Sequence, residues 1–130
     1  MNSEASFLKK NLIAFKAAIN GIAVALRSER NLRFHFFAVA AVSLLGALLG
    51  MTSLEWFIIL ILFAIVISME LINSAIESLC DLVQPEKDTQ IGKIKDISAG
   101  AVLWTCFIAL ITAIILFVPK LFILFSLSNH

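Results

Sequence analysis

The chain has 130 residues, of which 61% are hydrophobic and 15% charged, and its formal net charge is +1. Soluble domains are typically about 45–50% apolar, so this composition, gathered into long apolar runs, indicates an integral membrane protein. A net charge this small gives no overall attraction to polyanions, and no nucleic-acid partner is expected. We expect one domain over residues 1–130, and oligomerisation to complete any polar site within lipid.

The amino-terminal region is predicted to be a loose polar start over 1–6 and an amphipathic helix over about 7–28. Apolar residues recur there at steps of three and four, and polar and basic residues fall on another face; the apolar set is Leu8, Leu12, Phe15, Ile19, Ile22 and Leu26, and the other is Lys9, Lys16, Asn20 and Arg27. The pattern is typical of a helix lying in the membrane surface. A targeting arm or a packing helix without lipid contact is the alternative.

Three apolar runs predict membrane spans at about 34–50, 55–72 and 97–118. Gly46 and Gly50 form a GxxxG pair at the end of the first span, which permits close helix contact. The second helix is expected to continue to Val83, because Pro85 then stops it. A polar loop is expected over 84–93. Pro119 is expected to close the third span, and the apolar tail over 121–127 is either a surface segment or a continuation of the helix. The small residues 98–101, which open the third span, are expected to lie opposite the acidic end of the second helix across a helix contact.

The basic residues lie almost entirely on one side of these spans. That side holds Lys9, Lys10, Lys16, Arg27, Arg30, Arg33, Lys87, Lys93 and Lys95, and the other holds only Lys120. By the positive-inside rule, the amino terminus and the 84–96 loop are expected in the cytosol and the carboxyl terminus outside.

The second span ends in a stripe of polar and acidic residues. At about 100° per residue, Glu70, Asn73, Ser74, Glu77 and Asp81 share one helical face. Glu70 follows fourteen uncharged residues, and a carboxylate within a bilayer is costly enough to indicate a function. An ordinary helix end with solvated acids is the simpler alternative.

These acids suggest a metal site and a base. Glu29, Glu77, Asp81 and Asp96 are expected together at the cytosolic boundary. Magnesium often takes one or two carboxylates plus phosphate oxygens, which makes Glu29 and Glu77 candidate ligands for phosphoryl transfer. Glu70 lies deeper, where a lipid hydroxyl would lie, and is a candidate base. No standard nucleotide-binding loop is present, and a small proton-coupled transporter is an alternative.

A resemblance to a known family rests on the run ELINSAIE from Glu70 to Glu77, then Asp81, Lys95-Asp96 and the run AGAVL at 99–103. Together these resemble the signature of the small prokaryotic diacylglycerol kinases, a family that includes undecaprenol kinases. The resemblance covers about 10–119. It implies three transmembrane helices plus an amino-terminal surface helix, in a homotrimer with shared active sites in the bacterial inner membrane. The implied reaction transfers the γ-phosphate of magnesium-ATP to diacylglycerol, with undecaprenol as the alternative acceptor.

The resemblance also implies roles for single positions. Glu70 resembles the catalytic base, with Asn73 beside it, and Glu29 and Glu77 resemble the magnesium-binding pair. The positions implied to contact ATP are Lys10, Glu29, Glu77, Asp81, Glu86, Lys95 and Asp96. The positions implied to contact lipid are Lys10, Asn31, Arg33, Glu70 and Ala99.

Two departures from the family pattern affect the expected nucleotide contacts. Lys87-Asp88 stand where the family often has Tyr-His, and Ala17 stands where some members have an aromatic contact. The contacts made by those side chains are not expected here.

Overall fold

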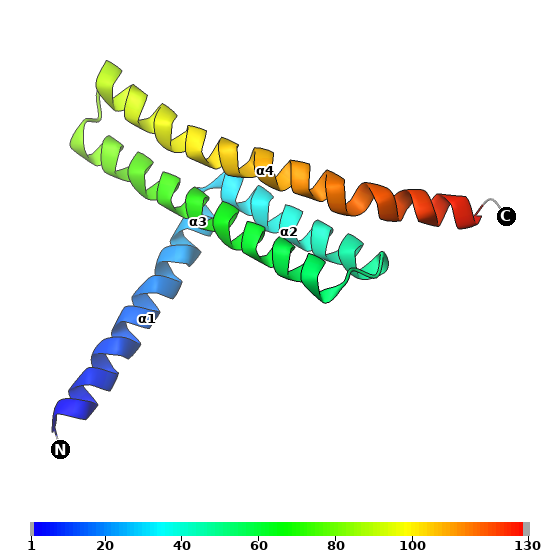
Figure 1. Ribbon diagram of the computed structural model, residues 1–130. Coiled ribbons are helices and arrows are strands. Elements are labelled where there is room, and N and C mark those ends of the chain that lie inside the picture. Colours follow the sequence, from blue (N-terminus) through cyan, green and yellow to red (C-terminus); the bar gives the residue numbers. More distant parts are fainter. Residues whose placement is uncertain (1, 129–130) are drawn as a thin grey trace.

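The computed structural model describes residues 2–128, and in that range it contains four α-helices: α1 (Asn2–Ser28), α2 (Arg30–Leu48), α3 (Ser53–Val83) and α4 (Thr89–Ser128). Helices α2, α3 and α4 lie side by side, whereas α1 points away from them (Figure 1). Helices α2, α3 and α4 are long and apolar enough to cross a membrane. The prediction of an all-helical protein is therefore confirmed, with three helices that by length and composition could be the predicted spans.

The helices are longer than the sequence predicted. Helix α1 begins at Asn2, within the expected loose start, and α4 begins at Thr89, within the expected loop. Helix α4 also continues through Pro119 to Ser128, so the apolar tail after this proline is a continuation of the helix. A proline removes one backbone hydrogen bond, a loss that membrane helices tolerate when neighbouring groups satisfy the exposed carbonyl.

The turn between α2 and α3 is determined by its own residues. Gly50 has a φ of 62°, which glycine adopts without strain. A Cβ on Gly46 would lie 2.5 Å from the sulfur of Met51, so this glycine makes room for the turn. Thr52 and Glu55 form a capping box at the start of α3, in which the Glu55 carboxylate accepts the Thr52 backbone N–H at 2.7 Å. The two glycines thus shape this turn, where the sequence suggested a helix-contact pair.

Few side chains are buried in the single chain. The buried apolar set is Leu32, Ile59, Val66, Cys80, Val102 and Phe117. Large apolar residues elsewhere on the helices are exposed, for example Leu82 and Ile97, as expected for helix faces that contact lipid or another chain. The described side chains of α1 are also exposed from residue 6 to residue 22.

Candidate active site

The predicted polar face of α3 is directed into the protein at its deeper end. Glu70 is 2% exposed and Asn73 is 7% exposed, with Ser74 on α3 and Ser98 on α4 also buried. The Asp81 side chain, three turns after Glu70, is 67% exposed. An ordinary solvated helix end describes Asp81 but not Glu70, because a buried carboxylate is retained only at a cost.

A chain of hydrogen bonds joins α4 to the acidic face of α3. The Asn73 side-chain N–H donates to Oε1 of Glu77 at 2.9 Å, and the Ser98 hydroxyl donates to Oδ1 of Asn73 at 2.6 Å. The Ser74 hydroxyl instead donates to the backbone carbonyl of Glu70 at 2.9 Å, within its own helix. Asn73 therefore links two helices and orients one carboxylate.

Glu29 lies at the break between α1 and α2, where its backbone is extended and its side chain makes no capping bond to α2. Glu29 lines a pocket together with Ser74 of α3, on the helix face that carries Glu70 and Glu77. His35 lines a groove with Val66, one turn before Glu70 on α3. The structure thus brings Glu29 to the face of α3 that carries the predicted base. His35 was not predicted, although an ionisable residue in an apolar helix is a signal that could have identified it.

The donor set at this site suits magnesium only with ligands from outside the protein. Within residues 6–126, whose side chains the structure describes, no group of three or more His, Cys, Asp or Glu side chains is placed to hold a metal ion. The ion pairs formed in this range join Lys95 to Asp81 and Lys120 to Glu55, so they leave Glu29 and Glu77 without a cationic partner. Two carboxylates are a common protein contribution to a magnesium site that phosphate oxygens and waters complete.

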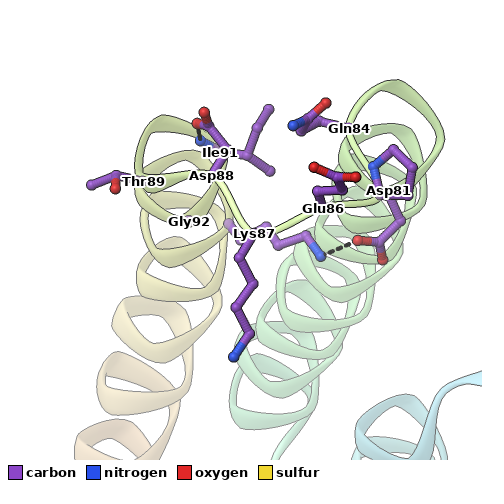
Figure 2. A pocket seen from close by; sticks show the side chains of 10 residues that line it. Asp81, Gln84, Glu86, Lys87, Asp88, Thr89, Ile91 and Gly92 are labelled. Atoms are coloured by element: carbon purple, nitrogen blue, oxygen red, sulfur yellow. Dashed lines mark hydrogen bonds and ion pairs between the residues drawn. The ribbon is translucent and has the colours of Figure 1, made fainter.

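A cleft of about 440 Å³ lies between the ends of α3 and α4 and the loop that joins them (Figure 2). Its lining residues are Asp81, Gln84, Pro85, Glu86, Lys87, Asp88, Thr89, Ile91, Gly92 and Lys95. Three of the positions expected to contact ATP, namely Asp81, Glu86 and Lys95, therefore share one cleft. The Lys95 ammonium donates to Oδ1 of Asp81, which joins the two helices at this cleft.

Asp88, one of the two departures from the family pattern, has a structural role. Its Oδ1 accepts the backbone N–H of Gln90 at 2.7 Å and of Ile91 at 3.0 Å. These bonds satisfy backbone donors in the first turn of α4, as a capping aspartate does. Asp88 therefore explains why α4 begins earlier than predicted.

The remaining predicted positions lie apart from this cleft in the single chain. Lys10 is on the half of α1 that extends away from the other helices (Figure 1). Asp96 and Ala99 are exposed on α4, and neither lines the cleft. Asn31 is exposed near the start of α2.

Arg33, predicted to contact lipid, has a partner within the protein. Its guanidinium donates to the backbone carbonyls of Leu26 at 3.2 Å and Arg27 at 3.0 Å. These carbonyls end α1, where no helical partner remains for them, and a basic side chain satisfies them well. Arg33 thus joins α1 to α2 around Glu29.

An apolar groove of about 300 Å³ runs along α2, α3 and α4. Its lining includes His35 on α2, Cys106 on α4 and Val66 on α3, one turn before Glu70. The rest of the lining is apolar, with small residues such as Ala38, Ala109 and Ala113. The groove thus offers an apolar path that reaches the neighbourhood of the buried carboxylate.

Three apolar helices with a buried carboxylate beside further acids define a small polytopic membrane protein with an intramembrane acidic site. The model of the family described as "Prokaryotic diacylglycerol kinase" matches residues 16–117. The chain belongs to this family of lipid kinases. Membership in this family favours the lipid-kinase interpretation over the proton-coupled transporter.

Relatives in three bacteria bear two different names. The chain is 38% identical to the undecaprenol kinase of Bacillus subtilis (strain 168) over 108 residues, which are 83% of this chain and 88% of the relative. It is 33% identical to a diacylglycerol kinase of Synechocystis sp. over 111 residues, covering 85% of this chain and 63% of that protein. It is 28% identical to the diacylglycerol kinase of Haemophilus influenzae over 103 residues, which are 78% of this chain and 87% of that protein.

Proposed function

We propose that this protein transfers the γ-phosphate of magnesium-ATP to the primary hydroxyl of a membrane lipid. The observation that carries the proposal is the nearly complete burial of Glu70 beside Asn73, Glu77 and Glu29. In this proposal, Glu70 accepts the proton of the lipid hydroxyl as that oxygen attacks the γ-phosphorus. Phosphoryl transfer needs little else from the protein beyond positioning and charge stabilisation.

Glu29 and Glu77 are proposed to hold magnesium together with the ATP phosphates. A bound magnesium ion would neutralise charge on the transferring phosphoryl group. The cleft beside Asp81, Glu86 and Lys95 is proposed to receive the nucleotide, since it lies at the end of α3 that carries Glu77. Lys95 and Lys87 are the two cations that line this cleft. Lys95 is the one proposed to face phosphate, since its bond to Asp81 holds it in place.

Diacylglycerol is the acceptor that the family pattern favours, and its product would be phosphatidic acid. Undecaprenol is a second candidate because the B. subtilis relative, which the match covers along 88% of its length, is named an undecaprenol kinase. Both lipids present a primary hydroxyl on an apolar body. The apolar groove near His35 and Cys106 is suited to either tail.

The working form is proposed to be a homotrimer with shared sites in the bacterial inner membrane. Lys10 supports this, because within one chain it lies on the part of α1 that points away from the α3–α4 cleft (Figure 1). Helix α1 is proposed to lie on the cytosolic membrane surface, with its exposed apolar face, including Leu8, Leu12 and Phe15, in lipid. The carboxyl terminus is proposed to lie outside.

The test is phosphorylation by the purified full chain in mixed micelles, with labelled ATP and either diacylglycerol or undecaprenol. Magnesium-dependent label in one lipid supports the proposal and identifies the acceptor. If neither lipid is labelled while the B. subtilis enzyme is active in the same micelles, the proposed function is wrong.

A further inference from the structure

We infer that Ser98 is a positioning residue for the proposed kinase site: its hydroxyl holds the Asn73 amide in the orientation that presents an N–H to Glu77. The inference rests on the proposed function and names a residue outside the site predicted from the sequence. Ser98 acts from α4 on a face of α3, across 25 residues of chain.

The contact is buried and close. Ser98 is 8% exposed and Asn73 is 7% exposed, so bulk water does not compete for these groups. The Ser98 hydroxyl lies 2.6 Å from Oδ1 of Asn73, and Nδ2 of Asn73 lies 2.9 Å from Oε1 of Glu77. A single amide thus has a different partner on each of its two polar atoms.

The chemistry of the two partners permits only one orientation of the amide. Oε1 of Glu77 accepts a hydrogen bond here, so the NH₂ group of Asn73 must face it. The amide oxygen then faces Ser98, which must donate. The hydroxyl has one proton, and the Lys95 carbonyl at 2.9 Å competes for it. The Asn73 oxygen is nearer, and it receives no other hydrogen bond within the described part of the chain.

Removing the Ser98 hydroxyl should therefore leave the Glu77 carboxylate less firmly oriented, because the Asn73 amide that donates to it would no longer be held in place. The buried amide oxygen would lose its donor, and the amide could rotate to seek another. Glu77 would then lose the N–H that orients its carboxylate toward magnesium. Groups that orient a ligand in this way typically contribute about 10- to 100-fold to metal affinity or activity.

Thr105 provides a matched control on the same helix. Its hydroxyl donates to the Val102 carbonyl three residues earlier at 2.8 Å, the same intrahelical geometry as the Ser98 bond to Lys95. Within the described range, no side chain accepts a hydrogen bond from the Thr105 hydroxyl. Thr105→Val removes a hydroxyl from α4 without touching the Asn73–Glu77 pair.

The experiment measures Mn²⁺ binding by electron paramagnetic resonance, with the full chain in mixed micelles and a non-hydrolysable ATP analogue present. Ser98→Ala should weaken Mn²⁺ binding about tenfold or more and raise the magnesium concentration that supports half-maximal turnover. The lipid KM should not change. Ser98→Thr, which keeps the hydroxyl, should restore binding, and Thr105→Val should match the wild type.

Equal Mn²⁺ affinity in Ser98→Ala and the wild type would overturn the inference. If Ser98→Ala does not fold, Ser98→Cys is measured instead, since its thiol keeps the volume and is only a weak donor. Wild-type protein that binds no Mn²⁺ and phosphorylates neither lipid would refute the proposed function itself. Wild-type binding with no effect of Ser98→Ala would refute only the role of Ser98.

Discussion

Lys95 on α4 donates a hydrogen bond to the carboxylate of Asp81 on α3, and this ion pair borders the cleft beneath the α3–α4 loop. The Asp81 side chain is 67% exposed and that of Lys95 is 33% exposed. Exposed ion pairs contribute little to stability. We therefore propose that this pair positions the Lys95 ammonium for a ligand in the cleft.

Asp81→Asn is expected to weaken ATP binding more than it slows the chemistry. The amide keeps the size of the side chain but no longer attracts the Lys95 ammonium, so the lysine loses its orientation. We expect a higher KM for ATP with a nearly unchanged kcat and lipid KM. Steady-state kinetics with ATP varied at saturating lipid would measure this, and a change in kcat alone would contradict it.

Glu70→Gln should abolish most of the maximal rate. A positioned general base contributes typically about 10²–10⁴-fold, and its loss acts on the transition state rather than on substrate binding. Glutamine has almost the same volume, so folding and ATP binding should survive. Asp81→Asn is the kinetic control. A Glu70→Gln enzyme with normal kcat and only a raised lipid KM would make Glu70 a headgroup contact.

Glu77→Gln and Glu29→Gln should each abolish turnover at low magnesium. Both remove a charged ligand, and Glu77→Gln also ends the charge-assisted bond from Asn73. The measurement is activity across a magnesium titration, with thermal unfolding and size-exclusion chromatography to verify assembly. Near-normal activity of both variants at low magnesium would show that the metal is bound elsewhere.

A mixed-oligomer experiment tests whether sites are shared between protomers. Lys10 does not line the cleft of its own chain, so we expect it to serve a neighbour. Co-expressed Lys10→Ala and Glu70→Gln chains should then regain part of the activity that each variant lacks. Glu70→Gln mixed with Glu77→Gln is the control, because both residues lie on α3 and should not complement. No recovery in the first mixture would place Lys10 in the site of its own chain.

The end of the α3–α4 pair away from the cleft is held by an ion pair between Lys120 and Glu55 at 3.0 Å. Lys120→Met should lower the thermal unfolding midpoint slightly and leave the KM for ATP unchanged, because the pair is far from the nucleotide cleft. The capping box of Thr52 and Glu55 should persist, since it needs no cation. A large loss of activity would mean that this contact sets the register of α3 against α4.

Topology gives a further test. A reporter fused after residue 130 should be active only outside the cytosol, because three spans place the two termini on opposite sides. Cytosolic activity of a carboxyl-terminal reporter would refute the three-span topology and with it the cytosolic position of the loop 84–88.

The sequence by itself determined three apolar helices that are long enough to span a membrane, the polar face of α3 and the resemblance to the family. Each depends on local information: the length of an apolar run, a spacing of three or four residues, or the order of residues in short runs. Glu70, Asn73 and Glu77 could therefore be placed on one face without any tertiary contact. Helix ends were predicted less well. The hydrogen bonds that Asp88 accepts start α4 within the expected loop, and α4 continues through Pro119.

Only the tertiary structure decided which atoms of distant residues meet that face. The small residues 98–101 were expected opposite it, but not the bond from the Ser98 hydroxyl to Asn73 across 25 residues. Glu29 and His35 lie beside α3 because α2 packs against it (Figure 1). Such approaches depend on how helices pack against each other, which periodicity within one helix does not encode. For the same reason, the sequence shows that Arg33 is basic but does not show that it caps α1 and joins α1 to α2 around Glu29.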